Sequence, residues 1–290
     1  MSHPAPPLSP QRVLLLAALA MLAFAGNSLL CRLALRHGSI DASSFTAVRL
    51  VSGACVLALI VRLRSGFFSS HGDWRSALAL FVYAAGFSFA YVQLSAATGA
   101  LLLFGAVQLT MVAVGLWRGE RLKALQWMGL AGACAGLVAM LLPGLAAPPL
   151  SGSLLMVCAG VAWGAYSLFG RGKGDATAVT AGNFWRAALL ALLLSGLTLG
   201  AAQVQPAGLG LAVASGALAS GLGYAIWYTA LRGLSAATAA SIQLTVPALA
   251  ALGAVVLLGE ALTWRLVLAS LVILGGVALV IWAKPRNATQ

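Results

Sequence analysis

Three amide side chains lie near the middle of long apolar runs, where their chemistry suits the binding of a small ligand. They are Asn27, Gln108 and Gln243. An amide offers two donors and an acceptor, so it can hold either end of a zwitterion without carrying a charge. Each amide can instead join neighbouring helices by a hydrogen bond, and both interpretations stay open. Gln243 favours binding because Pro247 frees a backbone carbonyl near it, and we predict a hinge at Pro247.

Aromatic side chains inside the apolar runs form a second set of candidate binding residues. They are Phe24, Tyr83, Phe87, Trp163, Tyr166 and Trp227. Their rings can stack on an aromatic ligand or attract a cation, although packing alone also explains each of them. Trp163 and Tyr166 are three residues apart and therefore share one face of a helix. Tyr224 and Tyr228 form a similar pair, but Tyr228 can equally face lipid.

Two arginines, Arg49 and Arg186, also lie inside apolar runs. A buried arginine must pair with an anion or contact carbonyl groups, so each can either anchor a ligand carboxylate or serve the structure. Arg49 lies about one turn inside its run, which allows its side chain to snorkel to the boundary. Arg186 lies deeper, but it occupies the matching position in the second half of the chain. This correspondence favours a shared structural role, such as pairing with a helix C-terminus.

The composition places all these residues in a membrane protein. The chain of 290 residues is 61% hydrophobic and 8% charged, whereas an ordinary soluble domain is about 25% charged. Turn residues and charges separate ten apolar segments long enough to cross a bilayer. The segments are 13–35, 43–62, 75–96, 98–117, 124–142, 151–170, 177–199, 208–231, 235–258 and 264–283. We therefore predict an all-α integral membrane protein with ten transmembrane helices.

The second half of the chain looks like a copy of the first. Leu94–Thr98 and Leu234–Thr238 are identical, and the apolar run after each ends in a Gly-Glu pair, at Glu120 and Glu260. The matched pairs carry weight because the chain holds only five acidic residues. Each half contains five segments, and an odd number forces the second copy to enter the membrane from the opposite side. We therefore predict two inverted-topology repeats, the arrangement used for alternating access.

The lysines and arginines set the orientation of these segments. With the N-terminus inside, the inner regions hold twelve of them and the outer regions hold three, which are Arg32, Arg36 and Arg265. We expect a bacterial inner-membrane protein with both termini in the cytoplasm. The net charge of +12 does not indicate nucleic-acid binding, because the basic residues lie at the ends of apolar runs. The expected boundaries are 1–12 for a disordered cytoplasmic tail, 13–145 and 146–283 for the repeats, and 284–290 for a cytoplasmic tail.

The middles of the apolar runs lack carboxylates and histidines, the side chains that could carry a proton across the membrane. Proton-coupled carriers usually use such a group as a relay, so we expect uncoupled, gradient-driven transport. The cysteines form no C-x-x-C pair and no phosphate-binding loop is present, so we predict no metal, no cofactor and no use of ATP. The lack of a buried catalytic cluster disfavours an enzyme, and the lack of rings of like charge disfavours a channel.

These features resemble the drug/metabolite transporter superfamily, specifically its ten-span EamA-type exporters. The resemblance rests on the Leu-Ser-Ala-Ala-Thr start and Gly-Glu end in each half, on Pro247, and on Arg49 and Arg186. The first half departs from the pattern, since Val107 stands where the second half has Pro247. Similar members export amino acids, aromatic ones among them. The resemblance implies a carrier for aromatic or neutral amino acids or similar small amphipathic metabolites; the alternative is an exporter of lipophilic or cationic drugs. We expect a monomer or weak homodimer surrounded by lipid.

Overall fold

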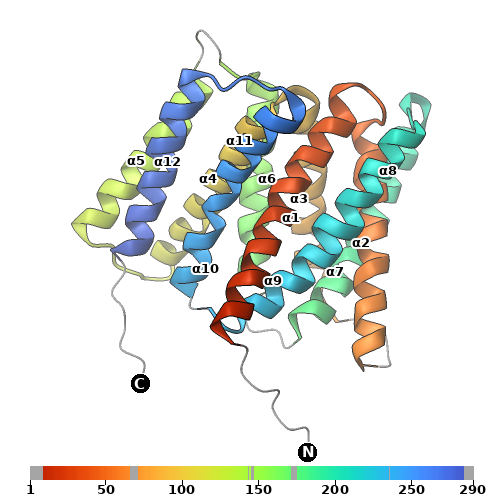
Figure 1. The fold of residues 1–290 in the computed structure, drawn as a ribbon, viewed down its shortest axis with the longest axis horizontal. Coiled ribbons are helices and arrows are strands. Elements are labelled where there is room, and N and C mark those ends of the chain that lie inside the picture. The colour runs from red at the N-terminus through yellow and green to blue at the C-terminus, as the bar shows by residue number, and fades with distance from the viewer. Residues whose placement is uncertain are drawn as a thin grey trace, which may run out of the picture.

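The computed structural model describes residues 9–65, 71–142, 144, 147–170, 175–234 and 236–283. Within them, ten helical segments are long and apolar enough to cross a membrane, which confirms the predicted fold class (Figure 1). Eight are single helices: α1 (Pro10–Arg36), α2 (Ala42–Ser65), α3 (Trp74–Gln93), α4 (Ala96–Trp117), α5 (Ala124–Leu141), α6 (Leu150–Phe169), α7 (Ala176–Leu197) and α12 (Trp264–Trp282). The eighth span comprises α8 (Pro206–Ala214), the π-helix η2 (Ser215–Leu222) and α9 (Gly223–Leu231). The ninth comprises α10 (Ala236–Gln243) and α11 (Thr245–Leu258).

The first helix begins slightly earlier than the sequence predicts, at Pro10 rather than residue 13. Ser9 caps α1, because its side chain accepts a hydrogen bond from the backbone N–H of Arg12. Proline suits the first helical position, where its missing N–H has no partner in any case. The predicted tail over residues 1–8, the tail 284–290 and the boundary between 145 and 146 lie outside the described residues.

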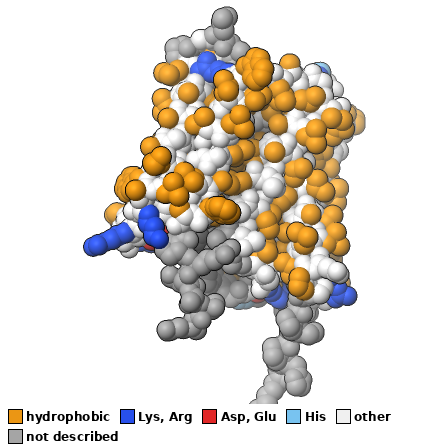
Figure 2. All heavy atoms as spheres, turned by 60° about the vertical axis from the view of Figure 1, so that its left-hand side comes forward, with side chains coloured by type: hydrophobic (Ala, Val, Ile, Leu, Met, Phe, Trp, Pro, Cys, Tyr) orange, Lys and Arg blue, Asp and Glu red, His pale blue; other side chains and the backbone are white. Residues whose placement is uncertain are grey.

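The surface of the bundle is that of a protein surrounded by hydrocarbon. Hydrophobic side chains cover the face in Figure 2, and the lysines and arginines visible there lie toward the helix ends. Trp117 and Trp282, which the sequence places near the membrane boundary, are each 88% exposed. Tryptophan at such positions typically sits at the headgroup level. The exposed apolar surface therefore belongs against lipid.

The two repeated sequence motifs lie at the ends of helices. In the first half, Ser95 is the N-cap of α4, and its side chain accepts a hydrogen bond from the backbone N–H of Thr98. At the other end of each motif, Gly119 and Gly259 have φ values of 90° and 64°. Glycine adopts this left-handed conformation without strain and commonly ends helices. The repeated residues thus start and stop the fourth and ninth spans.

The main contacts between helices correspond to one another when the two halves of the chain are exchanged. The exchange replaces spans 1 to 5 by spans 6 to 10. Under this exchange the α2–α7 contact and the α5–α12 contact each correspond to themselves. The α3–α6 contact corresponds to the contact of α1 with the eighth span, and the α4–α6 contact corresponds to the α1–α11 contact. All of these contacts are present. Figure 1 shows the α5–α12 pair at one edge and α2 with α7 toward the other. The halves are therefore related by a pseudo-two-fold axis between them.

The ninth span is broken, whereas its counterpart α4 is continuous. The break falls at Leu244, between α10 and α11 and three residues before Pro247. Proline has no N–H, so the carbonyl four residues earlier, that of Gln243, loses its helical partner. Val107 leaves this ladder intact in α4. The structure thus places an interruption where the sequence predicts a hinge, and movement there stays a prediction.

Glycines let α5 and α12 approach until their backbones touch. A Cβ on Gly276 would lie 2.4 Å from the carbonyl oxygen of Gly129, and a Cβ on Gly129 would lie 2.5 Å from that of Gly276. Neither distance is compatible with a side chain. The neighbouring Gly275 is different, since a Cβ there meets no atom within 4 Å. Close approach of this kind drives helix association in membranes, where water contributes no hydrophobic force.

We predict that Gly276→Ala destabilises the protein and that Gly275→Ala does not. The first substitution forces α12 away from α5, which costs about 1–3 kcal/mol in other overpacked proteins. The second adds a methyl group in open space and slightly favours the helix. Thermal unfolding in detergent measures both. Equal melting temperatures for the two variants would contradict the packing described for α5 and α12.

Candidate functional site

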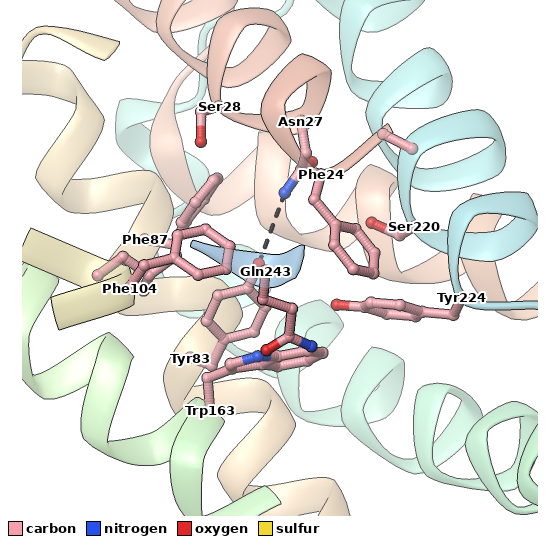
Figure 3. A pocket seen from close by; sticks show the side chains of 12 residues that line it. Phe24, Asn27, Ser28, Tyr83, Phe87, Phe104, Trp163, Ser220, Tyr224 and Gln243 are labelled. Carbon is pink, nitrogen blue, oxygen red and sulfur yellow. Dashed lines mark hydrogen bonds between the residues drawn. The ribbon is translucent and has the colours of Figure 1, made fainter. Parts of the chain in front are cut away.

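A small cavity lies at the centre of the bundle (Figure 3). Its lining comes from both halves: Phe24, Asn27, Ser28, Tyr83, Phe87, Leu103, Phe104, Trp163, Ala219, Ser220, Tyr224 and Gln243. Phe24 and Trp163 occupy matching positions in the two halves, because the segment 24–32 resembles 163–171, with Ser-Leu and a final Arg in common. The cavity therefore lies near the pseudo-two-fold axis. The space for the centre of a water molecule is only about 20 Å³, and one water needs about 10–15 Å³. A larger molecule therefore enters only if the surrounding rings move apart.

Stacked aromatic rings form one wall of the cavity. The indole of Trp163 stacks on Tyr224, with ring centroids 5.2 Å apart and planes 19° apart. It also contacts Tyr83 at 4.8 Å and stacks on Tyr166 at 5.3 Å. Phe24 completes the wall through a tilted contact with Tyr224 at 5.6 Å. This wall offers flat apolar faces to a ligand and can also attract a cation.

Not every predicted aromatic residue reaches the cavity. Tyr166 supports Trp163 from behind, and its hydroxyl lies 3.4 Å from that of Thr180. Trp227 is buried and packs edge-on against Phe24 at 6.1 Å. Both therefore position lining residues and do not line the cavity themselves.

The three predicted amides lie in three different settings. Asn27 donates to the Tyr83 hydroxyl at 3.5 Å, the dashed line in Figure 3, and accepts from Ser215 at 2.6 Å. Its hydrogen bonds thus join α1 to α3 and η2, although it also lines the cavity. Gln243 points into the cavity from the end of α10 (Figure 3). Gln108 is 4% exposed and lies outside the lining, and its Nε2 has no partner in the described chain.

The two arginines do not share one environment, contrary to the expectation from their matching positions. Arg49 is 1% exposed, so its side chain does not snorkel to the boundary, although its position in the sequence allows this. Its Nη2 donates to the Tyr83 hydroxyl at 2.9 Å, and its guanidinium lies over the rings of Tyr83 and Phe87. Arg186 is only partly buried and donates to the carbonyls of Gly182 and His71. Arg186 thus fits the predicted structural role, whereas Arg49 lies against the cavity wall.

Six lining residues are not in the predicted set, three of them on the eighth span: Ser28, Leu103, Phe104, Ala219, Ser220 and Tyr224. Ser220 and Tyr224 reach the cavity from η2 and α9. Tyr224 carries a signal, since it is a tyrosine inside an apolar run, but the sequence does not show which face it occupies. Ser220 carries none, because small hydroxyl residues are common in membrane helices. Its position depends on the π-helical turns of η2, which cannot be predicted from the sequence.

A carboxylate joins the halves at the end of the bundle where α1 ends, which we call the far end. Glu260 Oε1 accepts a hydrogen bond of 3.0 Å from Arg32, and Oε2 accepts one of 2.8 Å from the backbone N–H of Ala96. The N-terminus of α4 is a favourable place for this negative charge. Arg32 also donates to the carbonyls of Tyr91 and Val92. Together these contacts tie α1, α3 and α4 to the end of α11.

A second set of far-end contacts joins the start of α2 to the segment before α8. The Asp41 carboxyl accepts hydrogen bonds from Ser43, Ser44 and Gln203. Partial burial raises the pKa of Asp41, but these hydrogen bonds outweigh it and lower the pKa to about 2. Their contribution to stability is complete above the ordinary Asp pKa, near 4, and is lost as the pH falls through about 2. The contacts therefore persist across the physiological pH range.

Comparison with known proteins assigns this architecture to a family. The model of the EamA-like transporter family matches residues 11–142 and 150–282, which together span most of the chain. The chain belongs to the EamA-like transporter family. An uncharacterized protein of Pseudomonas aeruginosa is 58% identical to this transporter over 281 residues, covering 97% of this chain and 98% of its own. A solved crystal structure with 22% identity covers 94% of this chain and 99% of its own at a TM-score of 0.68, which supports the fold alone.

We predict that two buried glutamines of this EamA-like transporter respond differently to replacement by leucine. Gln126 uses both ends of its amide, accepting from the backbone of Lys123 and donating to the carbonyl of Val280. Gln126→Leu should therefore lower the melting temperature, at a cost of about 1–3 kcal/mol. Gln108→Leu removes a donor without a partner, so its melting temperature should be unchanged or higher. A melting temperature for Gln108→Leu as low as that of Gln126→Leu would show that Gln108 holds the helices together.

Proposed function

We propose that this protein is a carrier that exports aromatic or other neutral amino acids, or similar small amphipathic metabolites, by alternating access. The central cavity is the observation that supports it most directly. Flat aromatic faces from Trp163 and Tyr224 stand beside the amides of Asn27 and Gln243. A substrate with an apolar body and polar ends finds a complement for each part there.

The relation between the halves supports alternating access as the mechanism. Inverted repeats can rock against each other around a central site, exposing it first at one end and then at the other. The Glu260 contacts hold the far end together in this conformation, and the interruption at Leu244 lies directly beside the cavity residue Gln243. A change of angle between α10 and α11 would therefore alter the cavity and the far end together. Pro247 is the residue that we assign to this hinge.

The distribution of charge supports transport without proton coupling. All five carboxylates, Asp41, Asp73, Glu120, Asp175 and Glu260, lie outside the helices of the described chain. His37 and His71 also lie between helices. A carrier that moves protons through the membrane usually places such a group beside its substrate. We therefore propose facilitated transport driven by the substrate gradient, in the bacterial inner membrane, with both termini in the cytoplasm and the far end outside.

Export of lipophilic or cationic drugs is the second candidate function. The aromatic wall favours it, because stacked rings attract planar cations. The two functions differ in what the polar side of the cavity must bind. An amino acid requires donors for its carboxylate, whereas a planar cation requires only the rings.

The first test is transport in proteoliposomes loaded with labelled phenylalanine. We expect saturable efflux that an imposed pH gradient does not change. Trp163→Ala and Gln243→Ala should each reduce the efflux about tenfold, which corresponds to about 1.4 kcal/mol of lost binding. Trp282→Ala should not, because that ring is at the bundle surface. Efflux of cationic dyes without phenylalanine efflux would favour drug export, and efflux that requires a pH gradient would contradict uncoupled transport.

The role of Glu260 can be tested by opening the far end. Ser28 lines the cavity one turn before Arg32, so a cysteine there reports whether the far end admits a reagent. In a background without the native cysteines, Ser28→Cys should react slowly with a membrane-impermeant maleimide. Adding Glu260→Gln removes the charge that pairs with Arg32 and should accelerate the reaction severalfold. An unchanged rate would show that these contacts do not keep the far end closed.

A further inference from the structure

We propose that Arg49 is the group that binds the carboxylate of the transported molecule, so that the carrier selects amphiphiles bearing a carboxylate and rejects those bearing only a cation. This inference rests on the proposed function and specifies the substrate class of the same cavity. It differs from the structural role that the sequence alone favours for Arg49.

No opposite charge pairs with Arg49 among the residues that the structure describes. Its side chain is 1% exposed and lies about 10 Å along α2 from the start of that helix. An arginine remains charged in proteins, and a buried charge is costly unless an opposite charge accompanies it. All five Asp and Glu side chains are among the described residues, and none of them forms an ion pair with Arg49. The two hydroxyls and two rings around it are neutral.

The hydrogen bonding of Arg49 is also incomplete. Nη2 has a bond of 2.9 Å to the Tyr83 hydroxyl, but the bond from Nε to the Ser220 hydroxyl is long, at 3.4 Å. Nη1 is buried without any hydrogen-bond partner among the described residues. A guanidinium presents its N–H groups as a planar fork that matches the two oxygens of a carboxylate. Arg49 therefore retains a free donor and a weakly used one.

Two of the Arg49 nitrogens, Nε and Nη2, bond to residues of the cavity lining. Tyr83 and Ser220, the two partners of Arg49, both line the cavity. The Tyr83 hydroxyl receives a second hydrogen bond from Asn27. Donors from α1 and α2 thus converge on one hydroxyl at the cavity wall. A carboxylate that enters between Tyr83 and Ser220 can take over the long Nε bond and accept a second hydrogen bond from Nη2, on the same edge of the guanidinium.

The local backbone brings α2 and η2 close enough to form this site. A Cβ on Gly216 would lie 2.1 Å from the carbonyl oxygen of Arg49, so only glycine permits this approach. In a π-helix the hydrogen bonds join residues five apart, which therefore lie nearly above one another. Ser215 and Ser220 are five apart in η2, and they bond to Asn27 and Arg49 respectively. The π-helix thus directs one hydroxyl to Asn27 and the other to Arg49.

The aromatic wall next to this site completes the selection. The stacked rings of Trp163 and Tyr224 accept an apolar or aromatic body. A molecule with a carboxylate at one end and such a body at the other can contact Arg49 and these rings together. A planar cation would also meet the rings, but it would be repelled by Arg49 across a medium of low dielectric constant. The arginine therefore favours amino acid export over drug export.

The test compares ligands that differ only in charge. Phenylalanine, 3-phenylpropionate, phenylalaninamide and 2-phenylethylamine share one aromatic body, and only the first two carry a carboxylate. We expect 3-phenylpropionate to compete with phenylalanine efflux and to raise the melting temperature of the purified protein. Phenylalaninamide and 2-phenylethylamine should be at least tenfold weaker in both assays. Equal competition by the amine and the carboxylate in the wild-type protein would overturn the proposal without requiring any variant.

Variants then assign the effect to one residue. Arg49→Gln should weaken the apparent affinity for 3-phenylpropionate at least tenfold and remove the preference for it over 2-phenylethylamine. Arg49→Lys, which keeps the charge but loses the planar fork, should retain part of the preference. The control is Arg186→Gln, at the matching position in the second half, where the preference should be unchanged. A merely structural Arg49 would instead lower the melting temperature while leaving the ligand ranking intact, and that result would refute the assignment.

The two assays separate failure of this inference from failure of the proposed function. If wild-type protein moves no amino acid but 3-phenylpropionate stabilises it and 2-phenylethylamine does not, Arg49 keeps its role and amino acid export is wrong. If phenylalanine and phenylalaninamide are both transported with equal affinity, the carrier function stands and the role of Arg49 is wrong.

Discussion

Hydrocarbon offers backbone N–H and C=O groups no hydrogen-bond partner, so each apolar segment of this chain must satisfy them internally by forming a helix. The same constraint directs the polar side chains inward, where Asn27, Arg49 and Gln126 find partners on neighbouring helices. It also removes water as a force that presses helices together. Packing through small residues, as between Gly129 and Gly276, takes its place.

The two halves differ at several positions around the candidate site. Gln243 faces the cavity where the first half has Leu103, and the ninth span is interrupted before Pro247 where α4 continues through Val107. Arg49 lies buried against the cavity wall, whereas Arg186 bonds to carbonyls near the helix ends. A symmetric scaffold can rock between two equivalent arrangements, but a symmetric cavity cannot distinguish the two ends of a substrate. We infer that divergence of the halves supplied the selectivity.

The sequence predicts the ten spans and the repeat because hydrophobicity and turn chemistry are local properties. Ser95 and Gly259 illustrate this, since a helix cap or a left-handed glycine can be predicted from a few neighbouring residues. The site is less predictable because it depends on which helix face turns inward. Gln108 and Trp227 lie inside spans yet miss the cavity. Ser220 reaches it only through the π-helix η2, and the burial of Arg49 depends on Gly216 from the other half.

Alternating access requires that the two ends of the bundle open in opposite senses around one cavity. Spin labels at Val92 and Leu262 would report the far end, and labels at Arg118 and Arg232 the opposite end; all four side chains are exposed. Double electron–electron resonance should be recorded for each pair with and without Glu260→Gln. Alternating access predicts that the substitution lengthens the far-end distance and shortens the other. Lengthening at both ends together would indicate a channel and contradict the account.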